Sequence, residues 1–214
     1  NDTNFANYFG KMYQPRYLSG LAAGAMTDSN KIGYVAAFPI PEVIRGINAF
    51  AAGVNEVNPD ATVEVVWTFT WFGPEAETQA ANALLETGAD VLAQHQDSTA
   101  TGLAAEAAGA KWISYNTGYG KDSAPEAFVT APVWDWGPYY VDIVESIIDG
   151  TFSTESYWGG METGLVSLYD LSSDVPSDIA TLIGEKTDAI IDGTLEVEIV
   201  EEEFISNVIG TVNP

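Results

Sequence analysis

The residues best suited to bind a small molecule lie in five short stretches of the sequence, at 38–42, 71–75, 94–99, 116–120 and 134–137. Aromatic faces stack on flat rings, while amides and one carboxylate can match the donor and acceptor edge of such a ring. The set therefore predicts a planar, uncharged heterocycle as the ligand. Its aromatic and amide members, with their direct neighbours, are Phe38, Trp71, Phe72, Gln94, His95, Gln96, Tyr115, Asn116, Trp134 and Trp136.

Catalytic chemistry has little support in the same residues. The chain has one histidine, His95, and its acid and hydroxyl neighbours Asp97 and Ser98 are adjacent in sequence rather than assembled in space. No G-x-S-x-G turn, Walker loop or G-x-G-x-x-G loop is present. Without cysteine, and without an Asp-rich calcium loop, no metal site is expected. The sequence predicts a binding protein that is not an enzyme and needs no cofactor, with His95 as a satisfied polar or ligand-contacting residue.

The stretch from Lys31 to Phe50 shows how these loops are positioned. An apolar run is broken at 38–41 by two prolines, which fix φ and move the preceding residues out of the helical region. Pro41 and Glu42 suit the first turn of a helix, which apolar residues at three- and four-residue spacing continue. The first loop therefore follows a buried strand, where open α/β sheets bind ligands.

The same alternation of strand and helix continues along the chain. Strands are predicted at 63–71, 90–95, 111–116, 128–134 and 164–171, with an edge strand at 195–200. Helices are predicted within 17–26, 73–88, 100–109, 135–150 and 175–193, and Gly20 and Gly24 would let another backbone approach the first of them. This alternation is typical of an α/β fold with a parallel sheet, whose strands would bring the loops to one edge.

Composition excludes several classes of protein. With 7 basic and 31 acidic residues the net charge is −24, which repels nucleic acid and anionic membranes. The acidity is interpreted as a solvated surface, suited to a salty medium, rather than as an acidic binding site. An apolar fraction of 46% argues against disorder, and no apolar run reaches the roughly 18 residues of a membrane span. Because the first residue is Asn1 rather than Met, a processed or truncated start is expected.

Six segments of the chain resemble the basic membrane protein (BMP) or PnrA-like family, the substrate-binding proteins of ABC importers. They are YFGKMYQPRYLSGLAAGAM, KIGYVAAFPIPEVIRGINAF, VVWTFTWFGPE, GADVLAQHQDS, TAPVWDWGPYY and ESYWGGMETG. The resemblance implies a type I periplasmic-binding-protein fold, with two α/β lobes that are joined by crossing strands and close on a purine nucleoside or nucleobase.

The resemblance also implies a division into lobes. Residues 28–133 and 161–200 would form a complete second lobe, and residues 1–27 and 134–160 a remnant of the first, most of which is expected to be missing. The tail at 201–214 has no predicted place. Gly159 and Gly160 match glycines at the last crossing, where their freedom in φ suits a hinge.

Ligand contacts carry over from the family at eight positions: Phe38, Trp71, Phe72, Gln94, His95, Asp97, Asn116 and Trp134. Asn116 stands where many relatives have an aspartate that contacts the ligand, and Trp134 where nucleoside binders often have a lysine. These two departures favour a free base such as adenine over a nucleoside.

The resemblance thus implies an extracytoplasmic protein, periplasmic or at the cell surface, which delivers a purine to a membrane permease. Any membrane anchoring would come from an N-terminal lipid outside this sequence. One alternative is a ligand-sensing module of a signalling or regulatory system with the same fold. A second alternative, from another class of protein, is a nucleoside hydrolase that uses His95.

Overall fold

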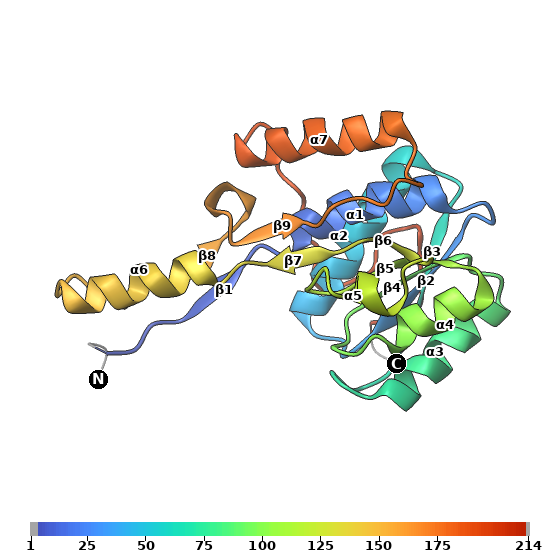
Figure 1. Ribbon diagram of the computed structural model, residues 1–214, viewed down its shortest axis with the longest axis horizontal. Coiled ribbons are helices and arrows are strands. Elements are labelled where there is room, and N and C mark those ends of the chain that lie inside the picture. Colours follow the sequence, from blue (N-terminus) through green and yellow to red (C-terminus); the bar gives the residue numbers. More distant parts are fainter. Residues whose placement is uncertain (1–3, 213–214) are drawn as a thin grey trace.

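A six-stranded parallel sheet forms the centre of the computed structural model, which describes residues 4–212 (Figure 1). The strand order is β10-β3-β2-β4-β5-β6, and every neighbouring pair is parallel. The predicted α/β fold with a parallel sheet is confirmed. The strands are β2 (Lys31–Ala36), β3 (Thr62–Trp67), β4 (Val91–Gln94), β5 (Lys111–Ile113), β6 (Phe128–Thr130) and β10 (Val208–Ile209).

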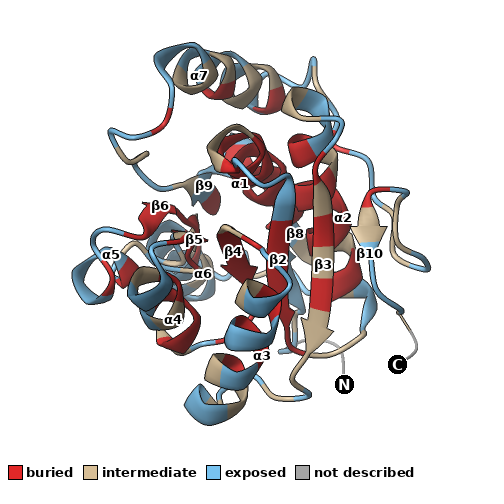
Figure 2. Cartoon of the chain, turned by 90° about the vertical axis from the view of Figure 1, so that its right-hand side faces the viewer, coloured by how far each residue is buried: buried red, intermediate tan, exposed pale blue. Residues whose placement is uncertain are grey.

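Helices cover both faces of this sheet, because successive side chains of a strand point to opposite faces. On one face Ile32 and Tyr34 pack in a core with α1 (Tyr13–Met26) and α2 (Pro41–Val57). On the other face Val35 packs in a second core with α3 (Pro74–Glu86) and α4 (Ala100–Ala108). The central strands are accordingly buried along most of their length (Figure 2). A further helix, α7 (Ser177–Ile191), packs against α1.

Two small residues hold α1 and α2 close together. A side-chain carbon on Gly20 would meet the carbonyl oxygen of Phe50, and one on Gly53 would meet that of Tyr17. Only glycine permits such close contact between helix backbones. The prediction that the Gly20 region receives another backbone is confirmed.

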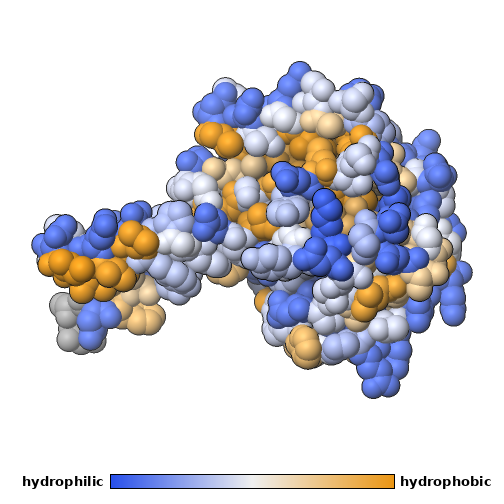
Figure 3. Space-filling view, in the orientation of Figure 1, coloured by the Kyte–Doolittle hydropathy of each residue, from blue (hydrophilic) through white to orange (hydrophobic). Residues whose placement is uncertain are grey.

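An arm projects from the rounded body that contains the sheet (Figure 1). It holds the parallel pair β1 (Tyr8–Gly10) and β8 (Tyr157–Gly159) and the helix α6 (Gly137–Ile148). Towards the body, β7 (Pro132–Trp134) pairs antiparallel with β9 (Val166–Leu168). Short helical turns complete the chain at α5 (Gly120–Ser123) and η1 (Met161–Thr163). Much of the outer surface of the arm is apolar, with Val141, Val144, Ile147 and Ile148 exposed (Figure 3).

Two predictions about the strands need correction. The strand predicted at 128–134 is divided between β6 in the main sheet and β7 beside the arm. The edge strand predicted at 195–200 is wrong, because β10 takes the sheet edge beside β3. The carbonyl of Val200 instead accepts a hydrogen bond from Asn48 Nδ2 at 2.9 Å.

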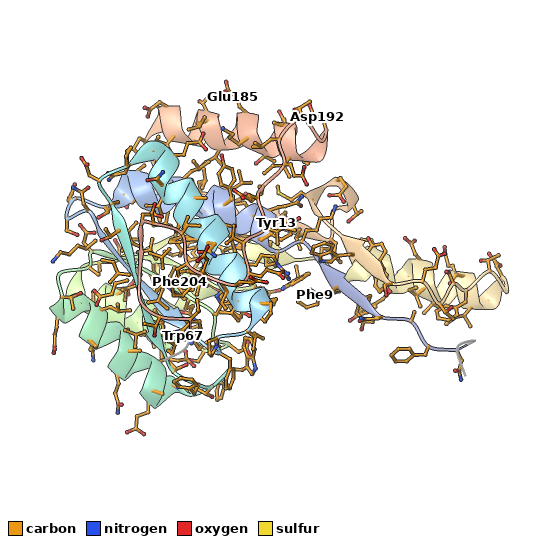
Figure 4. All side chains as sticks on the ribbon, turned by 180° about the vertical axis from the view of Figure 1, so that it is seen from behind. Phe9, Tyr13, Trp67, Glu185, Asp192 and Phe204 are labelled. Carbon is orange, nitrogen blue, oxygen red and sulfur yellow. The ribbon has the colours of Figure 1, made fainter. Side chains whose placement is uncertain are left out.

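The tail beyond residue 200 is thereby placed. Its Phe204 ring stacks on Trp67, with 6.2 Å between ring centroids, as seen from behind in Figure 4. Trp67 Nε1 also donates to the carbonyl oxygen of Thr211 at 2.8 Å. Residues 1–3 of the predicted first-lobe remnant and residues 213–214 of the tail lie outside the described residues.

Candidate functional site

A pocket of about 520 Å³ opens where the carboxyl ends of the strands meet the base of the arm. We call it the aromatic pocket. Its lining comes from the start of α2, from the loops after β3 and β5, and from β1 and β7, so segments far apart in sequence converge as predicted. It is lined by Phe9, Met12, Ile40, Glu42, Arg45, Trp71, Tyr115, Asn116, Trp134 and Trp136.

Stacked rings form one wall of the aromatic pocket. Trp134 and Trp136 are nearly parallel, with centroids 4.6 Å apart and 15° between their planes. Phe9 meets Trp134 edge to face at 5.4 Å, and its place between the arm and the body is visible in Figure 4. Trp134 Nε1 donates to Asn116 Oδ1 at 3.1 Å. These contacts fix the orientation of the wall.

Asn116 itself has a φ of 60°, in the left-handed region. Asparagine tolerates this region better than most residues. The turn after β5 can therefore aim the Asn116 side chain at Trp134.

Two charged residues line the aromatic pocket, both from the beginning of α2. Burial raises the pKa of the Glu42 carboxyl, while the guanidinium groups of Arg16 and Arg45 act to lower it. Arg45 forms an ion pair with Glu201 and lies 5.5 Å from the centroid of the Trp158 ring. The guanidinium group of Arg45 is thus already paired with Glu201 and Trp158 at the edge of the pocket.

Next to the aromatic pocket lies a group of buried polar residues, Arg16, Tyr34, Gln94 and His95, which we call the polar cluster. Arg16 Nη1 donates to the Tyr34 hydroxyl at 2.8 Å and to the Gln94 carbonyl at 3.4 Å. The Tyr34 hydroxyl is in turn 2.8 Å from His95 Nδ1. Arg16 also stacks 5.0 Å from the ring centroid of Tyr115, which lines the pocket. The polar cluster therefore supports the pocket from behind.

The protonation of His95 follows from these contacts. Burial, and then the nearby charge of Arg16, lower the pKa of His95 well below its usual value, so the ring is neutral. Because Tyr34 accepts from Arg16, it can donate its own proton to Nδ1, which leaves the ring proton on Nε2. Within residues 4–212, neither His95 Nε2 nor Arg16 Nε and Nη2 has a hydrogen-bond partner.

The structure brings three of the eight predicted ligand residues to the aromatic pocket: Trp71, Asn116 and Trp134. Phe38 packs against Trp71 at 5.5 Å without lining the pocket. Phe72, in the same loop as Trp71, is 66% exposed and does not line the pocket.

The third predicted loop, at 94–99, does not line the pocket as its neighbouring loops do. Gln94 and His95 are buried, and Gln94 Nε2 donates to the carbonyl oxygens of Gln96 and Ser98. Asp97 is exposed, outside the pocket lining, and its backbone N–H donates to the Trp71 carbonyl at 2.8 Å. The loop 94–98 thus positions Trp71 instead of lining the pocket. The ligand roles of these residues stay predictions.

The predicted hinge residues lie at the base of the arm. Gly159 and Gly160 are buried, and Gly160 has an extended backbone with φ −122°. A side-chain carbon on Gly160 would crowd the side chains of Glu162 and Gln14. In this conformation close packing explains glycine there, and the hinge role stays a prediction.

Sequence reasoning missed Phe9, Met12 and Arg45 in the pocket lining, and Arg16 beneath it. Ile40 and Glu42 lie in the predicted stretch 38–42 but were not named as ligand contacts. The sequence position of Glu42, directly after the first strand-end turn, could have identified it as a pocket residue. Arg16 also had a sequence signal, because it is the one charged residue between Tyr13 and Met26 in a chain with only 7 basic residues.

Other kinds of site find no support in the described residues. Across residues 4–212, no group of histidine, aspartate and glutamate side chains could hold a metal ion. No helix in this part of the chain has the length and apolarity needed to cross a bilayer.

The sequence matches the model of the Bmp family, described as ABC transporter substrate-binding protein PnrA-like, over residues 1–200. A Haloferax volcanii protein whose name describes an ABC transporter glucose-binding protein is 43% identical over 194 residues, 91% of this chain and 49% of that protein. A Brucella abortus protein named as purine-binding is 39% identical over 188 residues, 88% of this chain and 53% of that protein. The chain spans about half the length of the curated relatives it matches.

Among solved structures, an ABC transporter solute-binding protein from Aeropyrum pernix K1 is similar with a TM-score of 0.81 at 16% identity. The match covers 93% of this chain and 68% of that one. At this identity the likeness shows the fold alone, which is that of the type I periplasmic binding proteins.

Proposed function

The chain belongs to the family of PnrA-like ABC transporter substrate-binding proteins, and from this premise we propose that it captures a solute for an ABC importer. The ligand we propose is a purine, with a free base such as adenine favoured over a nucleoside. The protein would bind its ligand without chemical change, outside the cytoplasm, and deliver it to a membrane permease.

One observation carries this proposal: the aromatic pocket presents flat rings at the carboxyl edge of the sheet. The volume of about 520 Å³ is within the range of small-molecule sites. The parallel Trp134 and Trp136 rings and the nearby Trp71 offer faces on which a flat heterocycle can stack. Asn116 and Trp134 line the pocket at the two positions where the sequence departs from an aspartate and a lysine, and these departures favour a base over a ribose-bearing ligand.

The proposed capture includes closure of two lobes. Residues 28–133 and 161–200 would form the complete second lobe, and residues 1–27 and 134–160 part of the first. The body and the projecting arm support this division, although α1 packs with the body against α2. Gly159 and Gly160, at the base of the arm, would be the hinge. Closure would exclude water from the pocket and strengthen its hydrogen bonds.

Two neighbouring aromatic residues provide the test. Trp71 lines the aromatic pocket, whereas Phe72 is exposed and outside the lining, so their alanine variants form a matched pair. In the full natural chain, Trp71→Ala should weaken adenine binding about ten- to a hundredfold, because a stacked aromatic contributes about 1–3 kcal/mol. Phe72→Ala should leave it within about twofold. Isothermal titration calorimetry would measure both, and equal affinity in wild type and Trp71→Ala would contradict the proposed site.

A sugar is the second candidate ligand, favoured by the name of the Haloferax volcanii relative. The aromatic pocket could also pack against the apolar face of a hexose. Titration of the wild-type protein with adenine and with glucose separates the two candidates. Binding of glucose without binding of adenine would replace the purine by a sugar in the same pocket.

A further inference from the structure

The carboxylate of the aromatic pocket is not the one that the sequence singled out. Asp97 is exposed and outside the lining, whereas Glu42 lines the pocket. Glu42 stands in the first turn of α2 directly after Pro41, where the positive end of the helix dipole favours a negative charge. The helix end therefore favours the charged form of the Glu42 carboxyl, while burial raises its pKa.

The Glu42 carboxylate has electrostatic support but no hydrogen-bond donor among residues 4–212. Burial raises the pKa of Glu42, the charges of Arg16 and Arg45 oppose this rise, and no hydrogen bond contributes. Arg45 is engaged by Glu201, and the hydrogen bonds of Arg16 go to Tyr34 and Gln94. A half-buried carboxylate that lacks a donor gains from a partner that supplies one.

From this geometry we infer that Glu42 is the specificity-determining residue of the aromatic pocket, where it accepts a hydrogen bond from the ligand. The ligand class is a flat heterocycle whose edge carries a donor, either an exocyclic amino group or a ring N–H. This inference rests on the proposed function, because it assumes that the pocket holds such a ring. It adds the requirement that the edge facing α2 be a donor.

A matched pair of glutamates makes the inference testable. Glu75 follows Pro74 in the first turn of α3 as Glu42 follows Pro41 in α2, but Glu75 is exposed and outside the pocket. Glu42→Gln keeps the shape of the side chain and removes its charge. Since hydrogen bonds to charged groups are about twice as strong as neutral ones, Glu42→Gln should weaken adenine binding about tenfold or more. Glu75→Gln should leave adenine binding unchanged.

Calorimetric titration of the full natural chain would measure the affinity of both variants for adenine and for unsubstituted purine. Thermal unfolding would check that the variants are folded. A loss for adenine alone supports contact with the amino group, and an equal loss for both supports contact with a ring N–H. Adenine affinity within about twofold of wild type in folded Glu42→Gln overturns the inference but leaves the proposed function intact. Failure of the wild type to bind either compound overturns the proposed function, and the inference with it.

Discussion

The polar cluster and the aromatic pocket lie side by side at the same edge of the sheet, yet they differ in burial and in what their side chains contact. The polar cluster is buried, and its groups are directed at one another, as in the chain from Arg16 through Tyr34 to His95. The aromatic pocket is open, and its Trp71 is 38% exposed. Tyr115 touches both regions, since it stacks on Arg16 and lines the pocket.

The difference arises from where the side chains stand relative to the strand ends. Gln94 ends β4 and His95 follows it directly, so both are still within the packed layers: His95 lies against Gly46 of α2, and the Gln94 side chain accepts from Trp112 Nε1 on the opposite face of the sheet. Trp71 and Asn116 stand further beyond β3 and β5, where Trp71 is exposed and Asn116 is half-buried. A strand-end position is therefore not enough to make a ligand contact. The residue must also extend past the helices that cover the sheet.

The largest effect should come from a change that overfills the polar cluster. A side-chain carbon on Gly46 would lie 2.9 Å from Arg16 Cδ and 2.9 Å from His95 Cε1. Gly46→Ala should therefore lower the free energy of unfolding by about 2 kcal/mol, measured by urea denaturation, because overpacked cores must shift. In α7, Gly184 has no neighbour within 4 Å, so Gly184→Ala should raise stability by about 0.5 kcal/mol. Equal effects of the two variants would show that the cluster is loosely packed.

Much of the fold could be predicted, because its determinants are local. The prolines at 39 and 41, the apolar spacing after them and the β-branched run at 63–66 each specify their own element. The exceptions depended on competition between segments. Residues 195–200 have the alternation of a strand, but β10 occupies the sheet edge, and nothing local in 201–214 reveals that outcome.

The site was harder to predict than the fold for a similar reason. Trp71 and Phe72 are neighbours of the same type, and sequence alone cannot tell which ring enters the pocket. The structure separates them because the Trp71 carbonyl accepts from the Asp97 N–H, a contact between distant segments. The burial of His95 likewise depends on Arg16, which is far away in sequence.

The polar cluster should also make stability depend on pH. Burial lowers the pKa of His95 well below 6.5, so the folded protein stays neutral where the unfolded chain takes up a proton. Below about pH 6.5 the unfolded state binds more protons, and stability therefore falls as pH falls, by up to about 1.4 kcal/mol per pH unit. Since His95 is the one histidine, urea denaturation between pH 7.5 and 5.5 isolates its effect from most carboxylates.

His95→Gln is the matching variant, because its amide oxygen can still accept from the Tyr34 hydroxyl. It should remove most of the pH dependence in this range while the fold is kept. A wild-type protein whose stability is flat from pH 7.5 to 5.5 would mean that His95 can be protonated in place, and the cluster would then not be closed to water.

The smallest expected effect on stability concerns the backbone of Asn116, whose side chain accepts a hydrogen bond from Trp134 in the wall of the aromatic pocket. Asn116 has a φ of 60°, a conformation that costs an alanine about 1 kcal/mol and a glycine almost nothing. Asn116→Ala should therefore be less stable than Asn116→Gly by about 1 kcal/mol in urea denaturation. Both variants lose the acceptor for Trp134 Nε1, so both should bind adenine more weakly.

Asn30 supplies the control, because it has the same φ of 60° at the opposite end of the sheet, before β2. Its alanine and glycine variants should differ in stability by a similar amount, since the backbone cost is the same. They should not change adenine affinity, because Asn30 does not line the pocket. If the Asn116 variants bind adenine as the wild type does, the hydrogen bond to Trp134 does not orient the wall. The stacking of Trp134 on Trp136 would then suffice to hold it.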